Sequence, residues 1–108
     1  MSVGIERRKS PRKNVLLTGK VIHGEGAYVL DCTIRDVSTT GARITLAKVG
    51  QIPQRVFLLD LANRVVHDAE VMSERAGGVG LKFVKTIRLA DAPPELRYVK
   101  RIWMEFAR

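Results

Sequence analysis

Three arginines close to the start of the chain have the side chains and spacing of an anion-binding group. Arg8 and Arg12 form an Arg-x-x-x-Arg pair, and Arg7 lies beside them. A planar guanidinium group can bind a phosphate or the O6/N7 edge of guanine through two hydrogen bonds, and it can also stack on a base. These arginines therefore favour a phosphate-bearing ligand that carries guanine.

A second motif, Asp-x-Ser-x-x-Gly over residues 36–41, supplies groups that complement such a ligand. The Asp36 carboxylate can accept hydrogen bonds from guanine N1 and N2, and the Ser38 hydroxyl can donate or accept. Gly41 is expected to adopt a positive φ that lets the backbone approach a ligand. Two plainer interpretations stay open: the basic run is a solvated tail, and residues 36–41 form an ordinary turn in which Asp36 or Ser38 binds nearby backbone N–H groups.

The two motifs, in this order and in a small chain rich in β-patterns, resemble the PilZ domain, a bacterial receptor module for cyclic di-GMP. The resemblance runs from Glu6 to the late strand 78–83. It implies that a basic arm wraps the nucleotide while the turn holds one guanine on the surface of a β-barrel. The ligand-binding residues that it implies are Arg7, Arg8, Arg12, Asp36, Ser38 and Gly41.

The resemblance also implies a role for each of these residues. Arg8 and Arg12 contact phosphate and the edge or face of guanine, and Arg7 adds a stacking surface or a further phosphate contact. Asp36 and Ser38 form hydrogen bonds with the ligand, whereas Gly41 sets the backbone geometry. Whether one nucleotide or a stacked pair binds stays open.

Apolar residues alternate with more polar ones in most of the stretches that follow residue 13, and this pattern predicts six β-strands. Glycine-containing or short turns separate several of them, at 23–26, 62–63 and 76–78. The residues that mark the strands are Val15, Leu17, Gly19 and Val21; Tyr28, Leu30, Cys32 and Ile34; Ala42, Ile44 and Leu46; Phe57, Leu59 and Leu61; a run over 64–74; and Val79, Leu81 and Phe83.

Short strands joined mostly by tight turns favour antiparallel pairing that closes on itself. The predicted fold is all-β with a C-terminal helix, a six-stranded antiparallel split β-barrel of the PilZ type. We expect a flexible basic arm over residues 1–13, the barrel over 14–88 and a helix packed on the barrel over 89–108. A hairpin that leaves at Asn14 and returns at Asp36 brings Arg12 and Asp36 close together.

The last segment has a helical pattern. Asp91 is the expected N-cap, and Pro93 and Pro94 suit a first turn. An apolar stripe of Leu96, Val99, Trp103 and Phe106 is expected to face the barrel, with Trp103 covering its open end. The alternative is that this stripe binds a partner or a membrane as a basic amphipathic helix.

Composition limits the class of protein. The chain has 108 residues, enough for one domain, and a formal net charge of +8 that attracts anions. Its one cysteine, Cys32, excludes an internal disulfide and fits a reducing compartment as a buried, inert thiol. Neither a membrane span nor a signal peptide is apparent, so we expect a cytoplasmic protein.

Catalysis finds little support in the sequence. His23 and His67 are isolated, and no motif for metal binding or nucleophilic catalysis is present. We therefore expect no enzyme, no metal and no cofactor, and we interpret His67 as an ordinary strand residue. The ligand that the resemblance implies is cyclic di-GMP.

The favoured hypothesis is a cyclic di-GMP receptor and adaptor. Its arm would become ordered on the ligand, and it would signal to an unidentified effector protein of motility, exopolysaccharide or transcription machinery. One alternative is a PilZ-like protein-interaction scaffold that does not bind the nucleotide. Another is a basic nucleic-acid-binding barrel, which is disfavoured because aromatic residues for base stacking are scarce, at 6% of the chain.

Overall fold

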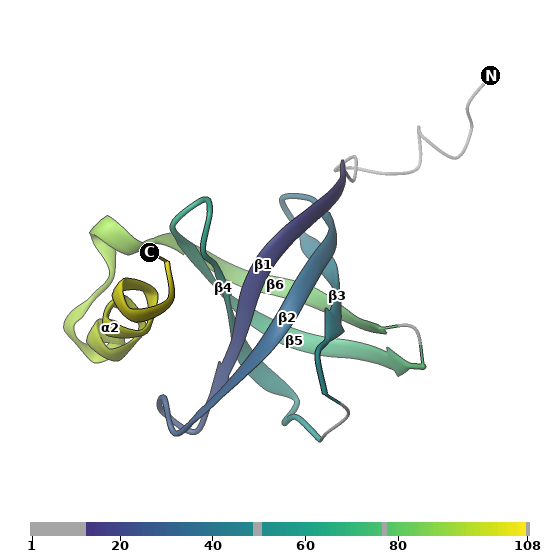
Figure 1. Ribbon diagram of the computed structural model, residues 1–108, viewed down its shortest axis with the longest axis horizontal. Coiled ribbons are helices and arrows are strands. Elements are labelled where there is room, and N and C mark those ends of the chain that lie inside the picture. The colour runs from purple at the N-terminus through teal and green to yellow at the C-terminus, as the bar shows by residue number, and fades with distance from the viewer. Residues whose placement is uncertain (1–12, 49–50, 77, 108) are drawn as a thin grey trace.

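Six antiparallel strands close into a barrel, and a helix follows them (Figure 1). The computed structural model describes residues 13–48, 51–76 and 78–107. Neighbouring strands around the barrel follow the order β1-β2-β3-β6-β5-β4. The prediction of a six-stranded antiparallel barrel followed by a helix is confirmed. The elements are β1 (Lys13–His23), β2 (Tyr28–Val37), β3 (Gly41–Leu46), β4 (Arg55–Asp60), β5 (Val65–Arg75), β6 (Gly78–Arg88), the 3-10 turns η1 (Leu89–Asp91) and η2 (Pro94–Leu96), and α2 (Arg97–Phe106).

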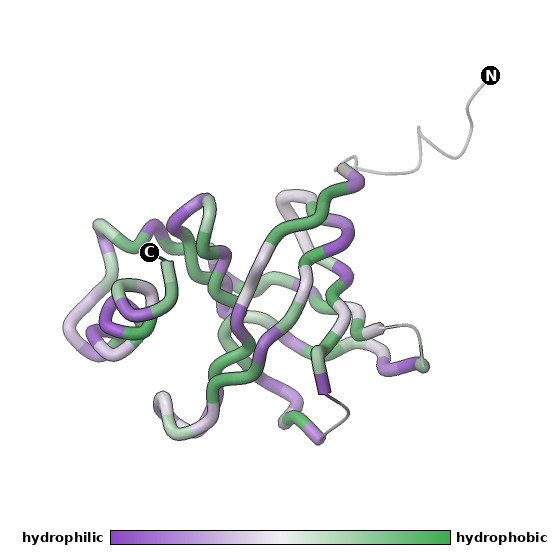
Figure 2. The backbone as a smooth tube through the Cα atoms, in the orientation of Figure 1, coloured by the Kyte–Doolittle hydropathy of each residue, from purple (hydrophilic) through white to green (hydrophobic). Residues whose placement is uncertain are grey.

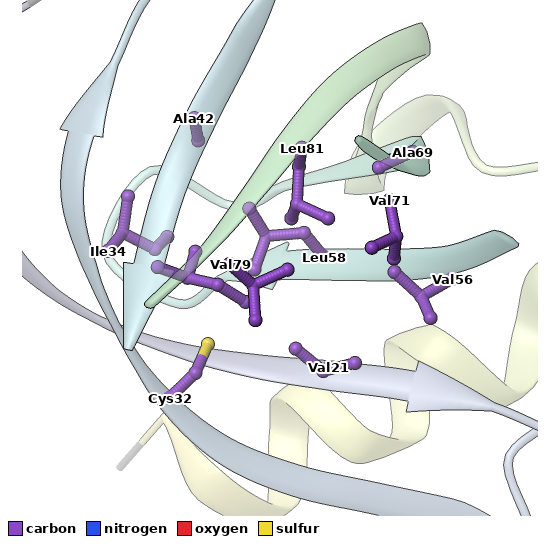
Figure 3. Close-up of a cluster of buried hydrophobic side chains, with 11 residues drawn as sticks. Val21, Cys32, Ile34, Ala42, Val56, Leu58, Ala69, Val71, Val79 and Leu81 are labelled. Carbon is purple, nitrogen blue, oxygen red and sulfur yellow. The ribbon is translucent and has the colours of Figure 1, made fainter. Parts of the chain in front are cut away.

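The barrel interior is filled by side chains from all six strands, because every second residue of a strand points to the same face. Figure 3 shows this inner cluster, to which Val21, Ile34, Leu58 and Leu81 belong. Cys32 lies within it and is 5% exposed. Burial raises the pKa of the Cys32 thiol to about 12. The thiol is therefore neutral at ordinary pH, as expected for an inert cysteine.

A second apolar cluster lies between the outside of the barrel and the C-terminal segment. Ile22, Leu59 and Val66 contribute to it from β1, β4 and β5, and Leu96 and Val99 contribute from η2 and α2. Ile22 follows inward-facing Val21, and Leu59 follows inward-facing Leu58, so both of them point outward. Figure 2 accordingly shows long hydrophobic stretches in the barrel strands. The helix covers this outer apolar face because β1 and β4 are apolar on both sides.

The prediction that Trp103 covers an open end of the barrel is wrong. Trp103 packs with the outer cluster, and its Nε1–H donates to the Leu61 carbonyl oxygen at 2.9 Å. Phe106 is 46% exposed and lies under the Lys20 ammonium group, 4.0 Å from Nζ to the ring centroid. In the fourth strand, Val56 and Leu58 face the interior. The residues that marked this strand in the sequence pack with the outer cluster: Phe57, Leu59 and Leu61.

The helix begins later than its sequence pattern suggests. Asp91 is the last residue of η1, and its carboxylate accepts a hydrogen bond from Arg88 Nε at 3.0 Å. Pro94 opens the separate 3-10 turn η2, and α2 starts at Arg97 with no side-chain cap. The expected N-cap role of Asp91 is therefore wrong, because the chain makes two short 3-10 turns before it becomes α-helical.

The His67 side chain is buried in the barrel, on strand β5. It pairs across β4 and β5 with inward-facing Leu58, it is 7% exposed, and its ring stacks on Phe83 with centroids 3.8 Å apart. Its Nδ1 lies 2.8 Å from Thr86 Oγ1. Burial lowers the pKa of His67 to about 4, and this effect outweighs the opposing one of the Asp60 carboxylate.

We expect His67 to make the protein less stable in mild acid. The pKa of His67 is below its ordinary value of 6.5 in the folded state, so the unfolded state binds an extra proton between those values. The stabilisation is fully present above the unfolded pKa and is lost as the pH falls toward the folded one. Between about pH 7 and pH 5 the loss amounts to roughly 2 kcal/mol, or a fall of about 10 °C in melting temperature.

Thermal unfolding followed by circular dichroism measures this dependence. His67→Gln should remove most of the slope over that range, whatever its effect on stability at neutral pH. His23→Gln is the matched control, because His23 is only half-buried, against the exposed ring of Tyr28. An unchanged slope in His67→Gln would contradict the assignment.

Candidate ligand-binding surface

A break in the strand register decides which way Asp36 points. Cys32 and Ile34 face the interior, and strict alternation would place Asp36 there too. The pairing of β2 with β3 shifts between Ile34 and Asp36, so that Asp36 lies opposite Arg43 on the outer face. A β-bulge of this kind redirects the side chains that follow it. The Asp36 side chain is consequently 22% exposed and reaches the surface.

Asp36 belongs to a row of paired residues that crosses five strands on the outside of the barrel. Asn14 of β1 pairs with Asp36, and Asp36 pairs with Arg43 of β3. Arg43 pairs with Gly80 of β6, which in turn pairs with Ser73 of β5. We call these five residues the outer row. Arg43 Nε lies 3.6 Å from Asp36 Oδ2, and the Arg43 side chain is 55% exposed.

Open hollows flank Arg43 on both sides. The first has a volume of about 680 Å³, and its lining includes Asn14, Arg35 and Asp36. The second has a volume of about 640 Å³, and its lining includes Ser73, Arg75, Gly80 and Lys82. Both volumes lie within the range of small-molecule sites. The surface therefore combines one carboxylate with four cationic side chains, those of Arg35, Arg43, Arg75 and Lys82.

The Ser38 side chain stabilises the turn that links β2 to β3. The Thr40 backbone N–H donates to Ser38 Oγ at 3.2 Å, and the Ser38 backbone N–H donates to the Gly41 carbonyl oxygen at 2.9 Å. Ser38 Oγ also lies 3.2 Å from Thr40 Oγ1. The turn is thus held by its own hydrogen bonds, as the plainer interpretation of the motif required. A rigid turn of this kind presents its neighbours in a fixed position.

Gly41 is needed for a reason other than the expected one. The glycines with positive φ in the described residues are Gly24, Gly26 and Gly78, so the expectation for Gly41 is wrong. A Cβ at position 41 would lie only 2.3 Å from the carbonyl oxygen of Leu81 in β6. Glycine at this position permits the close approach of β3 to β6 that builds the surface.

The predicted arginines Arg7, Arg8 and Arg12 lie outside the described residues. The description begins at Lys13, which pairs with Val37 at the end of β2. Its neighbour Asn14 pairs with Asp36. The residue that follows Arg12 in the chain is therefore adjacent to the strand that carries Asp36, as the hairpin argument predicted for the ends of these two segments.

Sequence reasoning did not identify Arg43 as a site residue. The alternation of residues 42–46 placed it on the outer face, which the structure confirms, but its partner Asp36 could be assigned only once the register was known. Arg35, Arg75 and Lys82 were missed for the same reason, since they lie on three different strands. What these residues share in the sequence is a basic side chain near a strand end or bulge. Many positions in a basic chain have this feature, so it does not identify a site.

Two further groups of observations bear on the chemistry. Within residues 13–48, 51–76 and 78–107, no group of three His, Cys, Asp or Glu residues is placed to hold a metal ion. The part of the chain that the structure describes also contains no helix long and apolar enough to cross a membrane. A small barrel with a rigid polar turn and exposed cations has features that suit a binding domain for an anionic ligand.

The family model of the PilZ domain matches residues 6–100 of the chain, so this protein belongs to the PilZ domain family. A search of curated proteins gave no match. PilZ domains are binding and adaptor domains and not enzymes, and membership implies a family of cyclic di-GMP receptors. The resemblance noted in the sequence is thus confirmed at the level of the family.

Proposed function

We propose that this protein is a receptor for cyclic di-GMP that binds the nucleotide between its N-terminal arm and the outer row. The observation that carries the proposal is the pairing of Lys13 with Val37 and of Asn14 with Asp36. Arg12 directly precedes Lys13 in the chain, and in the proposed complex its guanidinium would contact a ligand held at Asp36. In the proposed complex, the two halves of the PilZ motif would meet at one surface.

The chemistry of the outer row suits guanine. The Asp36 carboxylate can accept from N1–H and N2–H of the base, which adenine does not offer in the same arrangement. Its present partner Arg43 has Nε 3.6 Å from the Asp36 carboxylate, in an ion pair whose arginine side is exposed, and a long pair of this kind contributes little stability. A bound guanine would take over Asp36 and leave the Arg43 fork free for a phosphate.

The remaining cations extend the same surface. Lys82 and Arg75 line the hollow on the far side of Arg43, where Gly78 and Gly80 leave the strand surface without side chains. Phosphates of a dinucleotide carry permanent negative charge, and exposed cations attract them. In this arrangement Arg7, Arg8 and Arg12 close over the ligand from the arm.

Because PilZ domains are binding and adaptor domains, we expect the output of this domain to be a change that another protein detects. An arm that becomes ordered on the ligand exposes or covers surface beside β1 and β2. Such a ligand acts by stabilising one state of the domain relative to another. We accordingly propose an adaptor role, with an effector protein as the partner and the cytoplasm as the location.

Calorimetric titration of the purified protein tests the receptor function. Cyclic di-GMP should give saturable heat at about 150 mM salt, where exposed charge interactions are screened beyond roughly 8 Å. GTP, GMP and cyclic di-AMP should bind at least tenfold more weakly, because each lacks either the second guanine or the N1–H and N2–H donors. The fitted stoichiometry distinguishes one nucleotide from a stacked pair.

Two results would overturn the proposal. Absence of heat together with an unchanged melting temperature in the presence of cyclic di-GMP leaves the interaction scaffold as the function. Equal affinity for the nucleotides and for single-stranded DNA, with a steep loss as salt rises, assigns the cationic surface to nucleic acid.

A further inference from the structure

A groove between the barrel and the C-terminal helix lies on the side of the barrel away from the outer row. It has a volume of about 400 Å³ and is lined by the β4–β5 turn, by the end of β6 with η1, and by α2. In the order of strands around the barrel, β4 and β3 are opposite one another. Figure 1 shows α2 beside β4 and β3 on the other side. The groove and the outer row are thus separate surfaces.

The floor of the groove is apolar. Leu89 is buried there, and Trp103 is half-buried. The Trp103 Nε1–H already donates to Leu61, so the indole offers the groove its carbon surface and no free donor. Met104 is 65% exposed on the same helix. A flexible, polarisable methionine beside a tryptophan face is suited to the binding of an apolar side chain.

The rim of the groove is basic. Arg64, Arg88 and Lys100 line it, and the lining contains no acidic residue. The Arg64 guanidinium lies 5.2 Å from the centroid of the Trp103 ring, and Arg88 forms an exposed ion pair with Asp91 at 2.9 Å. Lys100 has no ion pair within the described residues. The groove therefore presents an apolar slot surrounded by positive charge.

We propose that this groove docks an acidic segment of a partner protein that inserts one apolar side chain between Trp103 and Leu89. The charge of the rim selects the acidic flanks, and the volume of the slot selects a single large apolar side chain as anchor. This inference rests on the part of the proposed function in which a partner protein contacts the domain. It does not depend on nucleotide binding.

Other occupants fit these features less well. The chain's own residues 1–12 contain four basic side chains, those of Arg7, Arg8, Lys9 and Arg12, and one acidic side chain, that of Glu6. They are therefore repelled by a basic rim. A second copy of a chain with net charge +8 meets the same repulsion. A lipid surface is flat and would leave the recessed slot unfilled.

The single tryptophan makes the test direct, because all indole fluorescence and the one indole N–H signal in NMR come from Trp103. The probes are short synthetic peptides with one central leucine or phenylalanine flanked by glutamates. We expect saturable quenching or enhancement of Trp103 fluorescence, and a shift of its indole N–H resonance. A peptide with central alanine, and one with lysine in place of glutamate, should bind at least tenfold more weakly.

Surface variants locate the binding. Met104→Glu and Lys100→Glu replace exposed residues, so both variants should fold. Each should lower the affinity for the acidic peptide at least tenfold. Lys82→Glu is the matched charge reversal on the opposite side of the barrel and should leave peptide affinity within about twofold. Two results would overturn the inference: no saturable change with either acidic peptide, or full affinity in Met104→Glu. A response to phosphatidylglycerol vesicles in place of the peptides would assign the groove to a membrane surface instead.

Nucleotide titration of the same variants separates this inference from the receptor function. Met104→Glu should bind cyclic di-GMP as the unaltered protein does. If the peptides do not bind while the nucleotide does, only the docking inference is overturned. If the nucleotide fails while the peptides bind at Trp103, the receptor function is lost and the docking surface stands.

Discussion

Alanine at position 12 is expected to weaken cyclic di-GMP binding about tenfold to a hundredfold, because a well-formed charge-assisted hydrogen bond contributes roughly 1.5–3 kcal/mol. Arg8→Ala should have an effect of the same size. Arg12→Lys is expected to weaken cyclic di-GMP binding as well. A compact ammonium group reproduces the charge of arginine but neither its two parallel hydrogen bonds nor its stacking plane.

Calorimetric titration of Arg12→Ala, Arg12→Lys and Arg8→Ala measures these effects. Arg97→Ala is the matched control, because it removes one exposed positive charge from α2, away from the outer row. Its affinity should match that of the unaltered protein. Full affinity in Arg12→Lys would show that charge alone is required at this position, and a loss in Arg97→Ala would show that net charge governs binding.

The second large effect is expected from Gly41→Ala. A Cβ at this position would lie 2.3 Å from the Leu81 carbonyl oxygen, and the obstructing atom is backbone that is itself part of a paired strand. The strands β3 and β6 must therefore separate locally. Overpacking of this kind costs about 3 kcal/mol, which corresponds to a fall of roughly 10–25 °C in melting temperature for a domain of this size.

Gly80→Ala is the matched control for Gly41→Ala. Its added Cβ would meet Ser73 Oγ at 2.7 Å, and Ser73 is exposed, so this hydroxyl can rotate away. We expect a loss below about 1 kcal/mol, and the further change Ser73→Ala should recover it. Equal melting temperatures for Gly41→Ala and the unaltered protein would contradict the close approach of β3 and β6.

Together these variants separate two functions within one motif. Gly41 acts on the folded barrel and should lower stability with or without nucleotide. The arginines of the arm should leave the melting temperature of the free protein unchanged and act only on affinity. Asp36 lies between these cases, since it is half-buried at the end of β2 and also faces the proposed ligand.

The outer row and the groove also suggest how one small domain can connect two molecules. The outer row crosses β1, β2, β3, β6 and β5, whereas the groove lies at the β4–β5 turn and α2. The two proposed ligands, a nucleotide and an acidic segment, would therefore occupy different surfaces of the domain. Whether one affects the other is measured by titrating the peptide with and without cyclic di-GMP.

Local sequence patterns were sufficient to predict much of the fold and to identify the family. Alternation of period two predicted the strands, since successive side chains of a strand point to opposite faces regardless of its partners. The turn predicted at 23–26 and the helical pattern near the C-terminus are equally local. The spacing of Arg8 and Arg12 and the motif 36–41 identified the family, because these motifs are properties of short stretches of chain.

Only the tertiary structure determined which side chains face outward and which strands approach each other closely, because short sequence patterns carry no information on contacts between distant segments. Asp36 lies two residues after buried Ile34, so strict alternation would bury it as well. Only the β-bulge in the pairing of β2 with β3 turns Asp36 outward to Arg43. Gly41 shows no local need for glycine, and its requirement comes from Leu81, forty residues away. Trp103 covers the outer face because β1 and β4 are apolar on both sides. Register and strand contacts depend on hydrogen bonds between distant segments, so they are settled only when the barrel closes.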